Sequence, residues 1–310
     1  MAEMLTFPVE ARKKFQDKSF QTAHNLSSHP LMQLPALVAL GQKLDRDQFE
    51  YSSGDTGPNQ RFEDIKHINL EPVEVMRQIE NCGAWMVLKN VESDPEYRKF
   101  IEDALDSGAR AAGFKSRQDA GMIDEQGFIF VASPHSTTAF HTDNEQNFFV
   151  QLHGTKTFHT FANENGEVVS QAEIERHPGD HRNHPYKESF EELATVYDLE
   201  PGDGIFLPHV WPHWVKAGDD YSISMAITWK TQAILRLNKL LVVNGVMRSI
   251  GIPQSPPGSY PAWDNTKVLA YTCARGLIEP FRRGERSRRF LRGLLFGRKA
   301  NYYYETGDQT

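Results

Sequence analysis

From about residue 127 to residue 229, apolar side chains recur with a period of two, and Gly, Pro, Asp and Asn interrupt them at short intervals. This alternation is typical of half-buried β-strands. It predicts eight short strands: Phe128–Ser133, Thr138–Asp143, Asn147–His153, Lys156–Phe161, Thr195–Leu199, Gly204–Leu207, Trp214–Lys216 and Ser222–Trp229. A series of this kind indicates a β-sandwich or a jelly-roll barrel.

The flanks of this region have different periods. Before it, helical spacing predicts helices over Leu31–Leu40 and Pro72–Ile79, and a third that opens at Asp94-Pro95, an N-cap followed by proline at the first helical position. The apolar run Ala84–Val91 has the length of a strand. After Trp229 the period returns to 3.6 and predicts three helices: Ala233–Met247, Ala262–Leu277 and Ser287–Phe296.

These changes of period divide the chain into three regions. We expect an N-terminal α/β flank over residues 1–126 and a β core over 127–230, which contains an insert at 166–194. A C-terminal helical region with a basic tail would follow over 231–310. The expected fold class is therefore mainly β with flanking helices.

Charge and composition exclude several classes of protein. The net charge is −7, yet residues 280–310 carry eight Lys or Arg and only three Asp or Glu, so the remaining body is strongly acidic. An acidic body argues against nucleic acid as a partner. No apolar run approaches the length of a membrane span, about 20 residues. We interpret the basic tail at 282–299 as a solvated helix, although an acidic partner or an anionic membrane surface could also bind it.

The two cysteines, Cys82 and Cys273, are far apart and match no metal or redox motif. The N-terminus also lacks the apolar segment of a signal peptide. Together these features predict a cytoplasmic protein.

A candidate metal site lies within the β region. His141 and Asp143 are two residues apart, and on a strand such residues point to one face. His213 follows seventy residues later, after the segment 208–212. Two histidines and one carboxylate on one side of an ion leave its other positions open, as in the facial triad of non-haem Fe(II) oxygenases. A His-x-Asp tripeptide alone is a weak signal, because most such pairs lie on surfaces.

Lys156 strengthens the signal. It lies on the next predicted strand, across the His153-Gly154 turn. A lysine inside a barrel is unfavourable unless a carboxylate pairs with it. A 2-oxo acid bound to the metal could supply that carboxylate, although alternation also permits Lys156 to point to solvent.

Two spaced motifs carry a resemblance to a known family. The first is Thr138-x-x-His141-x-Asp143-x-x-x-Asn147-Phe148-Phe149-x-Gln151-x-x-Gly154-x-Lys156, and the second is Gly202-Asp203-x-x-x-x-Pro208-x-x-Trp211-x-His213. They resemble the JmjC and cupin-like 2-oxoglutarate-dependent oxygenases. Within that family they are most similar to the asparaginyl hydroxylase that inhibits hypoxia-inducible factor. The resemblance covers residues 128–230, about a third of the chain.

The resemblance implies a double-stranded β-helix core of the jelly-roll, cupin-like type. It also implies an Fe(II)- and 2-oxoglutarate-dependent hydroxylase that uses O₂ and releases succinate and CO₂. The implied iron ligands are His141, Asp143 and His213. The implied contacts to 2-oxoglutarate are Lys156 and Thr138 at the distal carboxylate, with Asn147 and Thr228 near the cosubstrate.

The chain departs from the family pattern at two places. Thr228 stands where the related hydroxylase has an asparagine, and phenylalanines at 128 and 130 fall near the expected position of a tyrosine that contacts 2-oxoglutarate. Two other classes of function stay open: a non-catalytic cupin-like protein that binds a metal or ligand for regulation, and a zinc hydrolase, which the lack of an obvious general base disfavours.

Several other features have no assigned role. His177, His181 and His184 lie in the insert, where nearby Pro and Gly predict a loop rather than a zinc-binding helix. The resemblance also implies that the C-terminal helices mediate a homodimer. No motif identifies the substrate or the atom that is oxidised, nor whether the outcome is hydroxylation or demethylation.

Overall fold

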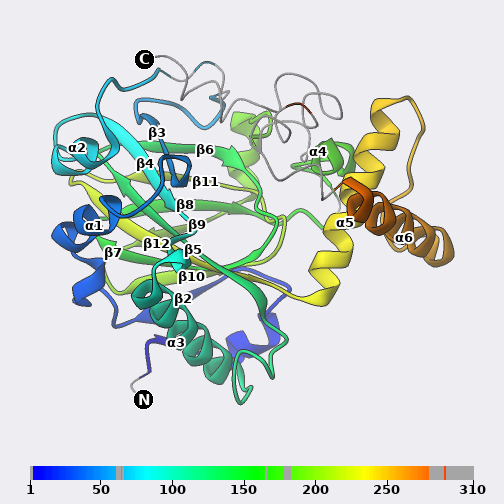
Figure 1. The fold of residues 1–310 in the computed structure, drawn as a ribbon, viewed down its shortest axis with the longest axis horizontal. Helices are drawn as coiled ribbons and strands as arrows, with labels where there is room; N and C mark the ends of the chain where they lie inside the picture. Colours follow the sequence, from blue (N-terminus) through cyan, green and yellow to red (C-terminus); the bar gives the residue numbers. More distant parts are fainter. Residues whose placement is uncertain are drawn as a thin grey trace. The chain divides into compact units, whose positions relative to one another are not determined.

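The computed structural model describes residues 3–60, 64, 66–164, 166–176, 183–278 and 290 (Figure 1). The chain forms two compact units. The first contains residues 1–162 and 185–231, and the second contains residues 163–184 and 232–310.

Two antiparallel sheets form the centre of the first unit (Figure 1). The eight-stranded sheet has the order β1-β2-β10-β7-β12-β5-β4-β3. Its strands are β1 Leu5–Thr6, β2 Phe20–His24, β3 Phe49–Ser53, β4 Ala84–Lys89, β5 Ile123–Ala132, β7 Gln146–His153, β10 Asp203–Leu207 and β12 Ser222–Lys230. The four-stranded sheet has the order β6-β11-β8-β9, with β6 Thr137–His141, β8 Lys156–Phe161, β9 Ala194–Leu199 and β11 His213–Ala217.

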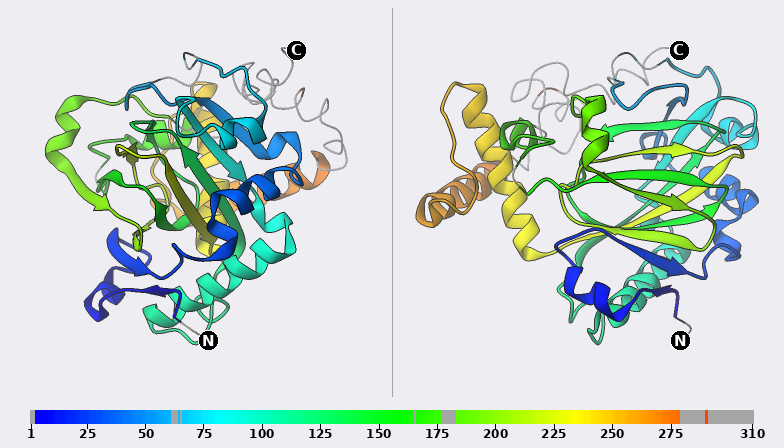
Figure 2. Two further views of the ribbon diagram at one scale, coloured as in Figure 1. Left: turned by 90° about the vertical axis from the view of Figure 1, so that its left-hand side faces the viewer. Right: turned by 180° about the vertical axis from the view of Figure 1, so that it is seen from behind.

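Within the first unit, helices flank the sheets (Figure 2). In the first unit these are α1 Leu34–Gly41, α2 Pro72–Arg77 and α3 Pro95–Ala112. Short 3-10 helices accompany them at Val9–Lys14, Pro30–Met32, Arg46–Gln48, Val91–Ser93 and Glu188–Leu193. The second unit contains α4 Gln171–Arg176, α5 Gln232–Ser249 and α6 Pro261–Ile278. The predicted fold class, mainly β with flanking helices, is confirmed.

Alternation places two apolar cores in the first unit. Even-numbered residues of β7 and odd-numbered residues of β12, such as Phe148 and Trp229, join the helix-facing core, which also includes Phe100 and Leu105 of α3. Phe149 of β7 and Ala226 of β12 point to the opposite side and join a smaller core between the sheets. The other members of this core are Phe158, Leu199, Ile205, Leu207 and Val215. The predicted site residues Asn147 and Thr228 have the same parity as Phe149 and Ala226 on β7 and β12, so they face this space between the sheets.

Helix α3 begins as predicted, because the Asp94 side chain accepts a hydrogen bond from the backbone N–H of Glu96 and Pro95 follows at the first helical position. It lies tightly on the large sheet. A Cβ atom at Gly108 would come within 2.5 Å of the Phe148 ring, so only glycine allows this approach.

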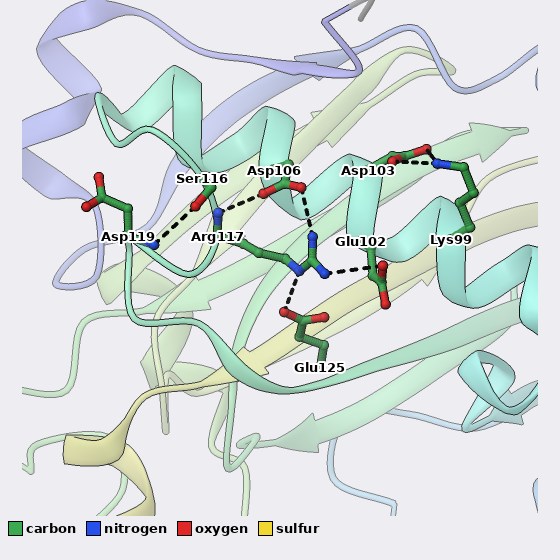
Figure 3. A network of polar contacts seen from close by, with 8 residues as sticks. All are labelled: Lys99, Glu102, Asp103, Asp106, Ser116, Arg117, Asp119 and Glu125. Carbon is green, nitrogen blue, oxygen red and sulfur yellow. Dashed lines mark hydrogen bonds and ion pairs between the residues drawn. The ribbon is translucent and has the colours of Figure 1, made fainter.

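A charged network closes the segment after α3 (Figure 3). The Arg117 guanidinium contacts three carboxylates: Glu102 at 3.2 Å, Asp106 at 2.8 Å and Glu125 at 2.8 Å. These carboxylates raise the pKa of Arg117, and partial burial raises the pKa of Glu125. The network joins α3 to the start of β5.

A buried polar network holds the second unit together. Glu175 of α4 is fully buried and accepts hydrogen bonds from Asn244 Nδ2 at 2.8 Å and from the Arg248 guanidinium. Asn244 Oδ1 in turn accepts a hydrogen bond from Lys267 Nζ of α6 at 2.7 Å. Among the described side chains of α6, only Asp264 and Lys267 are buried, so this helix is attached through polar groups.

The structure corrects several predicted boundaries. Strand β6 ends at His141, so Asp143 lies beyond the strand rather than on it. Pro35 stands in the first turn of α1, and the predicted helix Leu31–Leu40 is accordingly a 3-10 turn followed by α1. Strands β1, β2 and β3 were not predicted. The predicted helix Ser287–Phe296 and the basic tail lie outside the described residues, apart from the backbone of residue 290.

Two further predictions concern membranes and cysteines. No helix among the described residues combines the length and apolarity that a bilayer crossing requires. Cys82 and Cys273 are both free thiols. The division of the chain at residues 126 and 230 stays a prediction.

Candidate metal centre

His141, Asp143 and His213 lie together at one end of the space between the sheets. Asp143 Oδ1 is 3.9 Å from His141 Nε2, and Asp143 Oδ2 is 3.7 Å from His213 Nε2. One ligand atom from each residue lies within 4.8 Å of the others. In the described part of the chain, this is the one group of His, Cys, Asp and Glu that could hold a metal ion.

Backbone carbonyls set the tautomer of both histidines. The Nδ1 atom of His141 is 2.7 Å from the carbonyl oxygen of Ala139, and Nδ1 of His213 is 2.9 Å from that of Trp211. A carbonyl oxygen can only accept, so each Nδ1 carries the proton and donates. In each ring Nε2 is the nitrogen that faces Asp143, which is the arrangement of metal-binding imidazoles.

The pKa of His213 favours metal binding. Burial, and next the neighbouring His141, lower it to about 3, although Asp143 opposes this shift. The imidazole is therefore neutral at neutral pH, and no proton competes for its Nε2 atom. These donors, two imidazole nitrogens and a carboxylate with an open side, fit Fe(II) or a similar divalent ion.

A β-bulge aims these side chains at one point. Strands β6 and β11 pair His141 with His213 and Thr138 with Val215. Thr138 and His141 are three residues apart on β6, whereas their partners Val215 and His213 are two residues apart on β11. This one-residue difference identifies a β-bulge. The extra residue lets Thr138 and His141 point to the same inner face, although their spacing is odd.

Lys156 lies deeper between the sheets than the metal cluster. Its pairing partner on β11 is Ala217, four residues beyond His213. Its side chain is 5% exposed, and burial lowers the pKa of Lys156 to about 7. It forms no ion pair with a carboxylate in the described part of the chain. The Nζ atom instead donates to Ser224 Oγ at 2.7 Å and lies 5.6 Å from the centre of the Phe130 ring.

Thr138 lies beside Trp85, a neighbour of Phe130. Its Oγ1 accepts a hydrogen bond from Trp85 Nε1 at 2.8 Å. The Trp85 ring lies 6.1 Å from the Phe130 ring. Phe130 therefore neighbours both Trp85 and Lys156, and its ring offers no hydroxyl group.

Asn147 and Thr228 are paired on β7 and β12 near the level of the metal cluster. Asn147 is 3% exposed, and its Oδ1 has no hydrogen-bond partner among the described residues. Thr228 uses its hydroxyl to donate to the carbonyl oxygen of Gln126 at 3.4 Å. An unpaired, buried amide oxygen is costly, so Asn147 is a second sign that this space receives a polar ligand.

The other histidines considered from the sequence have different positions. His159 points to the outer side of the small sheet, where it stacks on Trp214 and contacts Glu191 at 2.7 Å. His153 stacks on Tyr221. His184 is buried, whereas His177 and His181 lie outside the described residues.

A family model described as a cupin-like domain matches residues 38–233. The chain belongs to the cupin-like domain family. None of the curated proteins matches the sequence.

Among solved structures, this cupin-like protein is similar to Escherichia coli ycfD, with 15% identity, a TM-score of 0.49, and coverage of 94% of this chain and 72% of that chain. A second similar structure is the Escherichia coli ribosomal oxygenase YcfD in complex with cobalt and 2-oxoglutarate, with 14% identity, a TM-score of 0.44, and coverage of 94% and 72%. A third is an oxalate decarboxylase formate complex from Lactobacillus farciminis, with 14% identity, a TM-score of 0.24, and coverage of 34% and 24%.

Sequence reasoning missed two residues of this cupin-like site, Trp85 and Ser224. Ser224 carried a signal, because small or polar residues alternate with large apolar ones along β12 and face inward. Trp85 carried none, because its partner Thr138 lies 53 residues away in the sequence.

Proposed function

We propose that this cupin-like protein is an Fe(II)- and 2-oxoglutarate-dependent oxygenase that uses O₂ and hydroxylates a protein side chain or a small molecule, with release of succinate and CO₂. One observation carries the proposal: the buried ammonium group of Lys156, which has no carboxylate partner among the described residues, lies between the same two sheets as a histidine–aspartate–histidine cluster. A 2-oxo acid with a second carboxylate is a ligand that satisfies both features.

In this proposal His141, Asp143 and His213 hold the iron. An iron ion held by these three residues would supply the binding of the 2-oxo acid and the activation of O₂. The protein's own task is to place the ligands. The Ala139 and Trp211 carbonyls accept hydrogen bonds from the Nδ1 atoms, so both rings present Nε2 to the ion.

Lys156 and Thr138 bind the distal carboxylate in this proposal. An ammonium and a hydroxyl donate to its oxygens, and the carboxylate in turn relieves the cost of the buried cation. Asn147 lies near the cosubstrate, where its amide can pair with a polar ligand. Thr228 has already used its donor on Gln126 and therefore contributes through its two oxygen lone pairs and its methyl group.

Succinate formation tests this proposal. The protein is incubated with Fe(II), 2-oxoglutarate, ascorbate and O₂, and succinate is measured by NMR with and without candidate substrates. We expect slow succinate release by the wild type and none by His141→Ala, which should also lose bound iron while its circular dichroism spectrum is unchanged. His153→Ala, outside the metal cluster, is the matched control. A wild type that binds iron and 2-oxoglutarate without any turnover would favour a non-catalytic binding protein.

The finer similarity to the asparaginyl hydroxylase of hypoxia-inducible factor is part of the proposal. A protein side chain would then be the substrate. Hydroxylation of peptides, followed by mass spectrometry of the product, distinguishes this from a small-molecule substrate. The cytoplasmic location and the lack of a nucleic-acid partner likewise stay predictions.

We also propose a homodimer through the C-terminal helices. Helix α6 exposes Trp263, Leu269 and Leu277 by 49%, 65% and 74%, and residues at this spacing share one side of the helix. Exposed apolar stripes of this kind are typical of interaction surfaces. Sedimentation of the full chain should give a particle of twice the monomer mass. Leu269→Glu should reduce the particle to the mass of a monomer. Val196→Glu on β9, 47% exposed in the wild type, is the control. A monomeric wild type contradicts the proposal.

A further inference from the structure

Two hydroxyl groups beside the candidate cosubstrate site each accept a hydrogen bond from a side-chain nitrogen. Thr138 Oγ1 accepts from Trp85 Nε1 at 2.8 Å, and Ser224 Oγ accepts from Lys156 Nζ at 2.7 Å. A hydroxyl group has one hydrogen to donate and two lone pairs to accept. Neither of these hydroxyls donates to an acceptor in the described part of the chain. Each therefore has one side occupied by an N–H donor and its own hydrogen available for a ligand.

The two hydroxyls belong to one continuous group of side chains. The Phe130 ring lies 6.1 Å from the Trp85 ring and 5.6 Å from Lys156 Nζ. Trp85 binds Thr138 on one side of this ring, and Lys156 binds Ser224 on the other. Ser224 is fully buried and paired with Phe130 across β12 and β5. The group therefore offers an ammonium and two hydroxyl hydrogens, all donors, around one apolar ring.

An anion with several acceptor positions can satisfy all three donors and pair with the ammonium charge. A carboxylate has two oxygens and about four lone-pair sites, so it can accept from all of them. A methyl or amide group in its place would leave at least one buried donor unpaired, which a protein site rejects strongly. The site therefore favours a dicarboxylic 2-oxo acid over a monocarboxylic one.

We propose that Ser224 is a third direct donor to the distal carboxylate, beside Lys156 and Thr138, and that Trp85 is a positioning residue that turns the Thr138 hydroxyl hydrogen toward it. This inference rests on the proposed function. Ser224 supplies the hydroxyl that Phe130 lacks. Trp85 acts by occupying a lone pair of Thr138, because the hydroxyl hydrogen must then point away from the indole.

Two ligands of equal carbon number test the inference. The full chain, loaded with Mn(II) in place of iron, is titrated calorimetrically with 2-oxoglutarate and with 2-oxopentanoate, which lacks the distal carboxylate. Loss of one hydrogen bond to a charged group should weaken 2-oxoglutarate binding by about 5- to 20-fold in Ser224→Ala and in Trp85→Phe. Binding of 2-oxopentanoate should not weaken in either variant.

Two further variants separate the roles. Ser222→Ala removes another fully buried serine on the inward side of β12. This serine is paired with Ala132 rather than Phe130 and bonds Gln151 Nε2 rather than Lys156, so 2-oxoglutarate binding should be unchanged. Thr138→Val removes the hydroxyl that Trp85 orients. In the Thr138→Val background, Trp85→Phe should have no additional effect, which a merely structural role of the indole would not produce.

The outcomes are distinct. Equal weakening of both acids in Ser224→Ala, or a Trp85→Phe effect that persists in the Thr138→Val background, overturns the inference and leaves the proposed function intact. If Ser224→Ala fails to fold, Ser224→Cys, which keeps the size but donates weakly, must show the same loss of selectivity. A metal-loaded wild type that does not bind 2-oxoglutarate at all contradicts the proposed function itself.

Discussion

Replacing the buried lysine should make the ligand-free protein more stable. Lys156 is 5% exposed and has no carboxylate partner in the described part of the chain, so its charge is held at a cost that methionine avoids. The fall of its pKa from 10.5 to about 7 corresponds to about 5 kcal/mol at 1.36 kcal/mol per pH unit. The lost hydrogen bond to Ser224 and the imperfect fit of methionine offset part of this, and we expect Lys156→Met to gain about 2–4 kcal/mol at pH 6.

The gain should depend on pH. The pKa of Lys156 is lower in the folded protein than in the unfolded chain, so the unfolded chain binds more protons between pH 7 and 10.5. Wild-type stability therefore rises with pH across this window. Below pH 7 both states are protonated and the full penalty applies. The advantage of Lys156→Met should thus be largest at pH 7 and below, and should shrink toward pH 10.

Urea unfolding at pH 6 and pH 9, followed by circular dichroism on protein freed of metal and ligand, measures this difference. Other titrating groups cancel when the variant is compared with the wild type at each pH. Lys216→Met, an exposed lysine on β11, is the control and should change the free energy of unfolding by less than about 0.5 kcal/mol. A variant less stable than the wild type at pH 6, or a gain that is equal at both pH values, would refute the account of Lys156.

Three other substitutions test the fold, the first two in the same unfolding assay and the third by hydrogen exchange. Gly108→Ala places a Cβ within 2.5 Å of the Phe148 ring and should destabilise the protein by about 1–3 kcal/mol; no loss would show that α3 can shift freely. Arg117→Leu leaves three neighbouring carboxylates without their cation and should cost about 1–3 kcal/mol at pH 7, with a smaller loss at pH 4, where carboxylates are partly protonated; a loss independent of pH contradicts this. Glu175→Leu leaves Arg248 unpaired and should speed hydrogen exchange in α4–α6 while exchange in β7 and β12 is unchanged; uniform acceleration would show that the second unit does not unfold by itself.

The alternation of apolar and polar side chains determined how much of the fold could be predicted. Strand β8 has the predicted bounds Lys156–Phe161, because a turn precedes it and alternating side chains fill it. Helix α3 begins at the predicted cap, Asp94. Strand β1 could not be predicted, because it has two residues and exists through its pairing with β2. A two-residue strand has no period.

The sequence pattern predicted the three residues of the candidate metal cluster, but not their geometry. His141, Asp143 and His213 lie together, but a two-residue spacing on one strand does not describe them, since β6 ends at His141 and a bulge aims it inward. The contacts of Trp85 with Thr138 and of Lys156 with Ser224 join strands that are distant in the sequence. Such pairs follow from sheet register, which a single sequence does not reveal.

The central claim is that iron and 2-oxoglutarate bind together at His141, Asp143, His213 and Lys156. The most direct measurement is anaerobic titration of 2-oxoglutarate into the Fe(II)-loaded protein, followed by visible absorption. Chelation of the iron by the 2-oxo acid should produce a charge-transfer band that saturates at one 2-oxoglutarate per iron, is absent in His141→Ala, and needs far more ligand in Lys156→Met. A wild type that binds iron but shows no band at saturating 2-oxoglutarate, or a band that His141→Ala retains, would contradict the account.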